Sequence, residues 1–144
     1  MTEKLVIARK RFAKDRFAAA LGITLDQLTD NSVTMHMQLS EDMVNWFDRP
    51  HGGAVYCLAD AAFSVLANNG ETLAVALECS ITYHASPPSD ALLVVEGETL
   101  SATRKTAAYL FKVYMENAES RAPVATMKSV AYRTRTPIDS TVKY

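Results

Sequence analysis

The residues of this chain that could do chemistry are concentrated between positions 45 and 69. A His-Gly-Gly turn at residues 51–53 leads into a strongly apolar segment, and a single acid, Asp60, stands inside that segment. Burying a carboxylate is costly unless the group is paired or used. Asp60 is therefore a candidate general base or nucleophile, and the alternative is a buried acid tied to a neighbouring hydroxyl or amide.

The two glycines of the turn, Gly52 and Gly53, stand where the apolar helix should begin. Backbone N–H groups at a helix start are unpaired and can form an oxyanion hole, although the glycines could also serve only the turn. His51 could be a base, a plain surface side chain or a hydrogen-bonding brace for the turn, and we expect the brace. Residues 52 and 60 are roughly 12 Å apart along a helix, so a working site needs Asp60 from one subunit and Gly52 from another.

Several other kinds of site find no support in the sequence. The three histidines are scattered and no acid cluster is present, so we expect no metal and no bound cofactor. The chain has neither a Gly-x-Ser-x-Gly elbow nor a phosphate-cradling Gly-x-Gly-x-x-Gly. Its formal net charge of −1 provides no global field for nucleic acid or an anionic membrane, so we expect neither as a partner.

Hydrophobic periodicity predicts the elements that position these residues. An amphipathic leading helix is expected over 3–21, the central apolar helix over 52–68, and a polar tail over 135–144. Alternating or mostly apolar stretches predict six strands, at residues 23–28, 32–39, 73–83, 91–102, 107–116 and 122–134.

The order of these elements predicts the fold of a single domain over residues 1–144. Consecutive strands with short connections form an antiparallel sheet, and the central helix is apolar on nearly every side, which is typical of a buried helix. One sheet of five to six strands wrapped around one long central helix satisfies both patterns. This is the α+β hotdog fold, here with an N-terminal amphipathic helix. A single sheet covers only part of such a helix, so we expect an oligomer to cover the rest.

Charge and cysteine usage suggest where a ligand could bind and where the protein works. Arg104 and Lys105 lie in a turn between two predicted strands, where they could hold the phosphates of a nucleotide-bearing substrate or be solvated. The N-terminus lacks the apolar core of a secretion signal. Cys57 and Cys79 have no metal-like spacing, and a reducing cytoplasm fits them best.

Nearly the whole chain resembles the hotdog-fold acyl-CoA thioesterases of the phenylacetic acid degradation (PaaI-like) type. The resemblance is carried by the leading helix, by the alternating strand before the loop and by a series of motifs. These motifs are Asn45 six residues before His51, Gly52-Gly53, Leu58-Ala59-Asp60, Ala62-Phe63, Asn68, Ile81-Thr82-Tyr83 and Ala131-Tyr132-Arg133. A lone His-Gly-Gly would be weak evidence, but the combined spacing is fairly specific.

The resemblance implies an acyl-CoA thioesterase that releases a free acid and CoA without a cofactor. The Gly52 N–H would polarise the thioester carbonyl, His51 would brace the turn, and Asn45 would position the carbonyl or the attacking water. Asp60 from the facing subunit would be the base or the nucleophile. Relatives of this type are usually homotetramers, built as dimers of dimers with the sites at the dimer interface.

Three departures from the family pattern bear on the substrate. Ala76 stands where some relatives carry a Ser or Thr hydroxyl, and the stretch 84–87 lacks the usual Arg-Pro pair. Trp46 and Phe47 replace small residues beside the site, so they are candidates for reshaping the acyl pocket, with Gly53 next to the bound substrate. Two alternatives remain: a hotdog hydratase or dehydratase, for which Asp60 has no histidine partner, and a non-catalytic acyl-CoA binding module, which would not need Asp60.

Overall fold

The computed structural model describes residues 3–117 and 119–138. Its elements in chain order are α1 (Glu3–Phe12), α2 (Arg16–Ala20), β1 (Thr24–Leu28), β2 (Ser32–Gln38), the short 3-10 helix η1 (Glu41–Met43), α3 (Gly52–Ala67), β3 (Thr72–Tyr83), β4 (Leu92–Ala102), β5 (Thr106–Glu116) and β6 (Arg121–Pro137). The strands form one six-stranded sheet in the order β1-β2-β4-β5-β6-β3, with every neighbouring pair antiparallel. Within the described residues, every helix is too short or too polar to cross a membrane.

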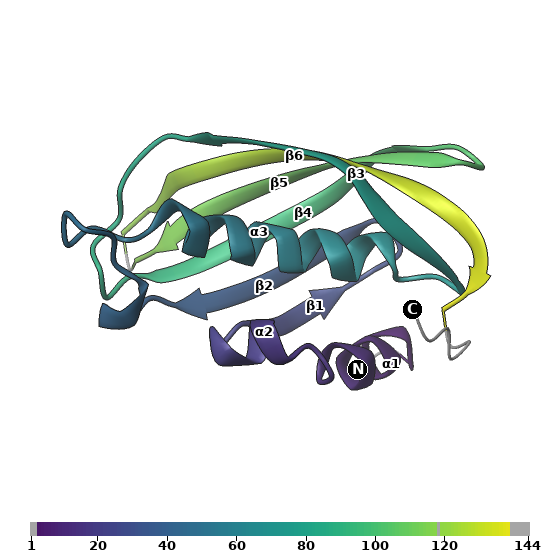
Figure 1. Cartoon of the computed structure of the whole chain (residues 1–144), viewed down its shortest axis with the longest axis horizontal. Coiled ribbons are helices and arrows are strands. Elements are labelled where there is room, and N and C mark those ends of the chain that lie inside the picture. Colours follow the sequence, from purple (N-terminus) through teal and green to yellow (C-terminus); the bar gives the residue numbers. More distant parts are fainter. Residues whose placement is uncertain (1–2, 118, 139–144) are drawn as a thin grey trace.

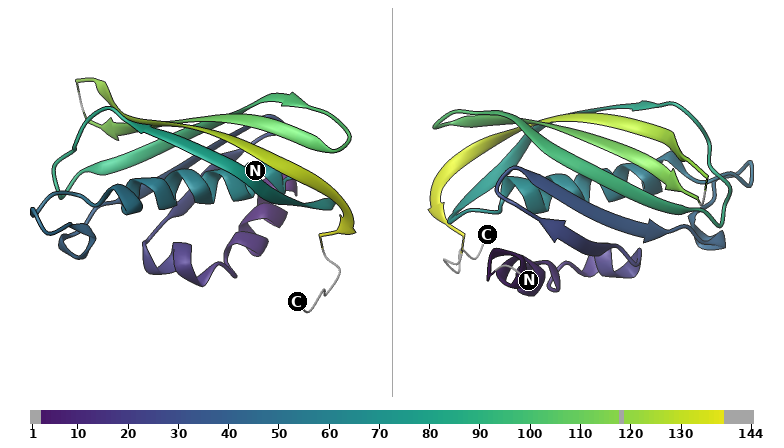
Figure 2. Two further views of the ribbon diagram at one scale, coloured as in Figure 1. Left: turned by 45° about the horizontal axis from the view of Figure 1, so that its top comes forward. Right: turned by 180° about the vertical axis from the view of Figure 1, so that it is seen from behind.

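The sheet curves around α3, which lies along its concave face (Figures 1 and 2). The strands alternate, as in β2, where Val33, Met35 and Met37 are buried toward the helix and the residues between them are partly exposed. Burying these apolar side chains against α3 supplies the hydrophobic driving force for the fold. The predicted α+β hotdog fold is confirmed, with six strands around one long helix.

An aromatic cluster joins α3 to the middle of the sheet. Phe63 on the buried face of the helix lies 5.5 Å from Tyr109 and 5.9 Å from Phe111, measured between ring centroids, and both partners are on β5. Tilted and edge-on arrangements at these distances are favourable for aromatic rings. The contact fixes the rotation of α3 about its axis, and so decides which helix residues turn away from the sheet.

The C-terminal end of α3 is tied to β3 by the amide of Asn68. Its Nδ2 donates to the carbonyl oxygens of Ser64 and Ala74 at 3.0 and 3.2 Å, and its Oδ1 accepts from the Ala74 N–H at 2.8 Å. These three hydrogen bonds join a carbonyl of the last helix turn to the first buried residue of β3. They hold the last turn of the helix against the strand.

The prediction of one leading helix over 3–21 is wrong, because the segment contains two helices. Asp15 has an extended backbone, and its Oδ1 accepts from the Ala18 N–H at 2.9 Å, which makes it the N-cap of α2. Asp is among the best N-cap residues, and a cap begins a new helix rather than continuing an old one. The spacing of apolar residues continues without interruption from α1 into α2, so periodicity alone does not reveal the boundary between the two helices.

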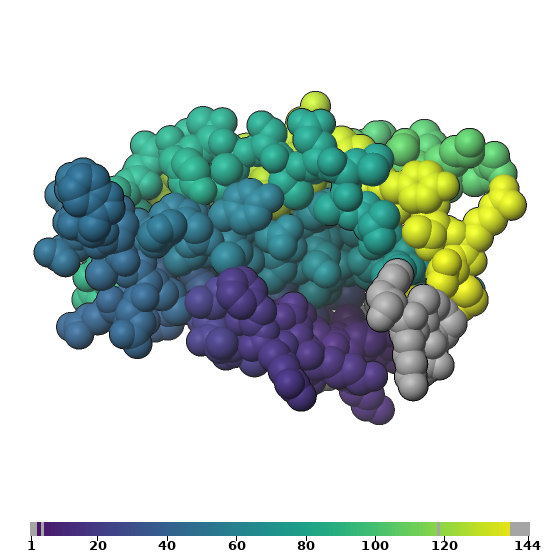
Figure 3. Space-filling model, in the orientation of Figure 1, coloured from purple at the N-terminus to yellow at the C-terminus, as the bar shows by residue number. Residues whose placement is uncertain are grey.

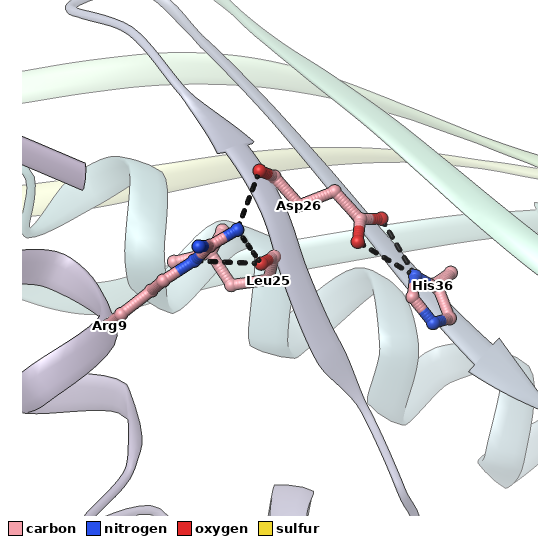
Figure 4. A network of polar contacts seen from close by, with 4 residues as sticks. All are labelled: Arg9, Leu25, Asp26 and His36. Atoms are coloured by element: carbon pink, nitrogen blue, oxygen red, sulfur yellow. Dashed lines mark hydrogen bonds and ion pairs between the residues drawn. The ribbon is translucent and has the colours of Figure 1, made fainter. Parts of the chain in front are cut away.

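A polar network holds α1 against the sheet (Figure 4). Arg9 donates from its guanidinium to the backbone oxygens of Leu25 and Asp26, each at 3.1 Å, where β1 has a bulge. Asp26 in turn accepts from His36 on β2, with 2.8 Å between Nδ1 and Oδ2. His36 is therefore paired rather than simply solvated, and Arg9 satisfies two backbone carbonyl groups of β1 beside its bulge.

The last strand is longer than its apolar pattern predicts. β6 continues to Pro137, so residues 135–137 of the predicted polar tail belong to the sheet. The extension is held by the Thr134 hydroxyl, which donates to the Leu73 carbonyl at 2.6 Å, and by the Ile138 N–H, which donates to the Glu71 carbonyl at 2.8 Å. Residues 139–144 of the predicted tail lie outside the described residues.

We expect the substitution Gly97→Ala in β4 to destabilise the fold by about 1–3 kcal/mol, as overpacked core sites do. A Cβ on Gly97 would lie 2.4 Å from the Phe111 ring and 2.9 Å from Val33, so Phe111 would have to leave the aromatic cluster. The matched control is Gly70→Ala, because a Cβ there meets nothing within 4 Å. Urea unfolding of both variants checks the expectation, and equal midpoints would contradict it.

Candidate active site

The loop before α3 is closed by Asn45. Its side-chain Oδ1 accepts from the N–H groups of Phe47 and Arg49 at 2.9 and 3.2 Å, and its backbone N–H donates to the Arg49 carbonyl at 2.7 Å. Asn is well suited to such turns because its short side chain reaches nearby backbone groups. No described residue accepts from the Asn45 Nδ2, which keeps its capacity to donate to a ligand.

The first turn of α3 presents an open backbone N–H. His51 Nδ1 accepts from the Gly53 N–H at 2.8 Å, so His51 does brace the turn, as expected from its position. The Tyr83 hydroxyl donates to the Gly52 carbonyl at 2.9 Å from the end of β3. Within the described chain the Gly52 N–H has no acceptor. A donor that is fixed on both sides and unpaired is well placed to bind a carbonyl oxygen.

Asp60 lies on the face of α3 that turns away from the sheet, and within one chain its side chain is exposed. The alternative of a buried acid tied to a neighbouring hydroxyl or amide therefore does not describe Asp60 within one chain. The reason is that the sheet covers only one side of α3, and Asp60 lies on the other. A band of α3 remains visible between the N-terminal helices and β3 (Figure 3).

The surroundings of Asp60 favour its protonated form. Asp60 lines a cavity of about 170 Å³ between α3 and β3, whose other walls include Phe63, Ala74 and Ala76. Partial burial by these apolar groups raises the pKa of the Asp60 carboxyl above its ordinary value, and the negative charge of Asp15 raises it further. A carboxylate with a raised pKa is a stronger base, as a general base requires.

Two other reactive side chains lie on the helix turn before Asp60. A hydrogen bond with Cys79 raises the pKa of Tyr56 to about 12, so its phenol stays protonated and engaged. Burial and the charge of Asp60 raise the pKa of the Cys57 thiol, which keeps that sulfur out of its nucleophilic thiolate form. Asp60 is the better candidate for the reacting group on this face.

The predicted site residues do not all meet in one chain. Gly52 and Asp60 lie on the same helix, about two turns apart. Trp46 and Phe47 are exposed at the tip of the loop, with their ring centroids 3.8 Å apart. The turn that carries Arg104 and Lys105 lies at the opposite end of the molecule from this loop (Figure 1).

Sequence reasoning missed three residues that contact or influence the site. Ser64 shares the cavity with Asp60, and its spacing of four residues on a helix could have found it. Tyr83 and Asp15 approach α3 from distant parts of the chain, and no local pattern indicates such contacts. Among the described residues, no group of three His, Cys, Asp or Glu side chains could hold a metal ion.

Comparison with known proteins gives a consistent result. The sequence pattern of the Thioesterase superfamily matches residues 50–122, which include α3 and Asp60. The chain is 32% identical over 96 residues to the acyl-coenzyme A thioesterase PaaI of Escherichia coli, an alignment that covers 67% of this chain and 64% of that protein. The two agree in structure, with a TM-score of 0.86 over 93% of this chain and 96% of the other.

Two further solved structures are similar. A variant of the phenylacetic acid degradation protein PaaI from Thermus thermophilus has a TM-score of 0.77 and 28% identity, over 83% of this chain and all of that one. A hypothetical thioesterase from Streptococcus pneumoniae, solved with coenzyme A, has a TM-score of 0.78 over 87% of this chain and 95% of the other. At 20% identity, this second likeness concerns the fold alone.

Proposed function

Because this chain belongs to the Thioesterase superfamily, in the PaaI-like group of thioester hydrolases, we propose that it hydrolyses acyl-CoA to a free carboxylic acid and CoA. The observation that carries the proposal is Asp60, a carboxylate of raised pKa in a cavity on the helix whose first turn presents the unpaired Gly52 N–H. The E. coli relative is named as an acyl-CoA thioesterase, which supports CoA as the thiol.

The proposed chemistry needs only groups of this chain and one water. The thioester carbonyl oxygen accepts from the Gly52 N–H, which stabilises the negative charge that develops there. Asp60 takes a proton from water as the water oxygen bonds to the carbonyl carbon, and the proton then passes to the departing CoA sulfur. Direct attack by Asp60, which forms a mixed anhydride that water then opens, uses the same residues and stays the alternative route.

We propose that each site is shared between two subunits of a homotetramer, arranged as a dimer of dimers. Gly52 and Asp60 of one chain are roughly 12 Å apart along the helix, too far to act on one carbonyl. A second chain could supply the missing partner, because β3 is an edge strand whose Val75 and Leu77 are 42% and 61% exposed. Sedimentation of the purified protein tests this, and a monomer that is fully active would contradict it.

The remaining candidates receive proposed roles around this shared site. The Asn45 amide donates to the carbonyl or the water, and His51 and Gly53 hold the oxyanion turn. Trp46 and Phe47 form a wall of the acyl pocket. Arg104 and Lys105 hold the phosphates of CoA bound mainly by another subunit, since they lie far from the loop of their own chain. We place the reaction in the cytoplasm, which suits two free cysteines.

Thiol release from a panel of acyl-CoAs tests the proposed function. Short, medium, long and aryl acyl groups would be supplied to the native protein, with free CoA followed by a colorimetric thiol reagent. We expect turnover, with the best substrate reporting the size of the pocket. No turnover of any member by a folded protein would contradict the proposal, and hydration of an enoyl-CoA would support the hydratase alternative instead.

We expect Asp15→Asn to move the acid limb of the pH profile of kcat/KM to lower pH. The charge of Asp15 helps to raise the pKa of Asp60, so removing that charge lets the Asp60 carboxylate stay ionised in more acidic solution. Asn is as good an N-cap as Asp, so α2 should keep its start. Glu98→Gln on the exposed part of β4 is the control for charge removal, and an unmoved limb in Asp15→Asn would contradict the expectation.

A further inference from the structure

The tyrosine at the end of β3 contacts the first residue of α3. The Tyr83 hydroxyl donates to the Gly52 carbonyl oxygen at 2.9 Å, across 31 positions of the chain. The tip of the Tyr83 ring also lies close to the Gly52 backbone, because a Cβ on Gly52 would lie 3.2 Å from Tyr83 Cζ and 3.3 Å from its Oη. Glycine is the residue that lets a side chain approach the backbone this closely. Gly52 therefore receives both a hydrogen bond and a packed ring from β3.

Tyr83 is itself anchored to the sheet. It pairs with Ala125 of β6 in the antiparallel ladder, and Ala125 is fully buried. The next residue, His84, donates its backbone N–H to the Val124 carbonyl at 2.7 Å, and its ring Nε2 lies 2.8 Å from the Thr126 hydroxyl. The phenol of Tyr83 is therefore supported by a paired, buried part of the sheet rather than by a free loop.

The peptide unit between Gly52 and Gly53 is held at both of its polar groups. Its carbonyl oxygen belongs to Gly52 and accepts from Tyr83, and its N–H belongs to Gly53 and donates to His51 Nδ1 at 2.8 Å. Because a peptide unit is planar, hydrogen bonds at its two opposite edges fix the orientation of the whole plane. His51 belongs to the same turn and moves with it, so Tyr83 is the residue that ties this plane to the sheet.

The preceding peptide plane carries the proposed oxyanion donor, the Gly52 N–H. The two backbone torsions of Gly52 are the only soft torsions between this N–H and the plane that Tyr83 and His51 hold. Glycine permits a wide range of both torsions, so Gly52 by itself fixes the direction of its N–H poorly. A donor stabilises a developing oxyanion most when it is already aimed and need not reorganise. Holding the following plane supplies the constraint that glycine lacks.

We propose that Tyr83 is a positioning residue of the oxyanion hole, which aims the Gly52 N–H by holding the Gly52 carbonyl. This inference rests on the proposed function, in which that N–H receives the thioester oxygen. Because Tyr83 acts through Gly52 in this role, its loss should slow the chemical step and leave substrate binding nearly intact. Partial burial raises the pKa of the Tyr83 phenol, and electrostatic interaction with Cys57 raises it further, so the hydroxyl stays a donor at neutral pH.

The variant Tyr83→Phe tests the proposal, because it removes the hydroxyl and keeps the ring beside Gly52. Tyr83 is 49% exposed, so the variant should fold, which thermal unfolding verifies. On the preferred acyl-CoA its kcat should fall by about 5- to 50-fold with little change in KM, a smaller loss than removal of the donor itself causes. The matched control is Tyr114→Phe on the outer face of β5, where the ring lies 5.4 Å from the Arg121 guanidinium. It should leave both constants unchanged.

A double variant separates positioning of the donor from other effects of the hydroxyl. Gly52→Pro has no N–H to aim, so adding Tyr83→Phe to it should lower kcat no further. A further loss as large as the one that Tyr83→Phe causes alone would overturn the proposal, because the hydroxyl would then act on a group other than this donor.

Amide hydrogen exchange tests the same contact without substrate. The Gly53 N–H lies in the plane that Tyr83 holds, so in Tyr83→Phe it should exchange at least about 3-fold faster than in the native protein, as measured by NMR. Unchanged exchange would overturn the proposal, and so would a native kcat or a raised KM with a native kcat. Failure of the proposed function is distinct, because the native protein would then release no thiol from any acyl-CoA while the difference in exchange remained.

Discussion

The variant Asp60→Asn should lose at least about 10²–10⁴-fold in kcat, the range that a general base typically contributes. Asn has nearly the same shape as Asp but cannot accept the proton of water or form an anhydride. The cavity around residue 60 offers no second carboxylate among the described residues to replace it. Thiol release from the preferred acyl-CoA measures the effect, with Glu98→Gln as the control for loss of one negative charge.

Folding of Asp60→Asn should be unharmed, and this distinguishes loss of chemistry from loss of structure. The pKa of Asp60 is higher in the folded chain than in the unfolded one, so ionising Asp60 disfavours the folded state above the unfolded pKa. Asn removes that cost. The thermal midpoint at neutral pH should equal or exceed that of the native protein, and the difference should vanish in acid, where Asp60 is protonated in both states. Near-normal turnover by the folded variant would remove Asp60 from the mechanism.

The second large effect is expected from Gly52→Pro, which removes the Gly52 N–H group and adds a side-chain ring. Loss of a single oxyanion donor costs about 10²–10³-fold in kcat in other hydrolases. Proline is well tolerated at the first position of a helix, and His51 already has the extended backbone, with φ −66° and ψ 131°, that residues before proline adopt. The fold should therefore be retained in this variant. Its kcat on the preferred acyl-CoA should fall.

Gly52→Ala is the matched control, because it adds a side chain and keeps the N–H. The added Cβ would lie 3.2 Å from the Tyr83 ring in either variant, so both variants share this crowding, while only Gly52→Pro loses the donor. Equal kcat values for the two variants would remove the Gly52 N–H from the site. Refolding Gly52→Pro together with Asp60→Asn should restore activity if the site is shared, since one site of each mixed pair then has both native groups.

Much of the fold could be predicted from local patterns, because those patterns directly reflect burial. The apolar run from residue 52 reflects the burial of α3, and the alternation in 32–39 reflects the buried and exposed faces of β2. The break at Asp15 could not be predicted, since a capping residue within an amphipathic segment leaves the periodicity intact. The extension of β6 to Pro137 depends on hydrogen bonds to residues more than sixty positions away, which no local window contains.

The local structure of the candidate site could be predicted where one segment of the chain contains it. The His51 brace and the position of Asp60 follow from the spacing within a single helix. The sequence predicts that the sheet leaves part of this helix uncovered, but it could not predict which residues of the helix are exposed, because an apolar helix looks the same in sequence whether its own sheet or another subunit covers it. The contact of Tyr83 with Gly52 and the charge of Asp15 near Asp60 arise only when distant segments pack together.

The exposed loop that precedes α3 also provides an optical signal. Trp46 is the single tryptophan of the chain; it is 86% exposed, and its ring lies tilted against that of Phe47. Its fluorescence emission therefore reports on the tip of this loop alone, without an added fluorophore. A tryptophan that leaves water for an apolar contact emits at shorter wavelength, so a blue shift on concentrating the protein or adding an acyl-CoA would show that the loop tip has been covered. The wavelength of Trp46 emission then measures assembly and ligand binding separately from turnover.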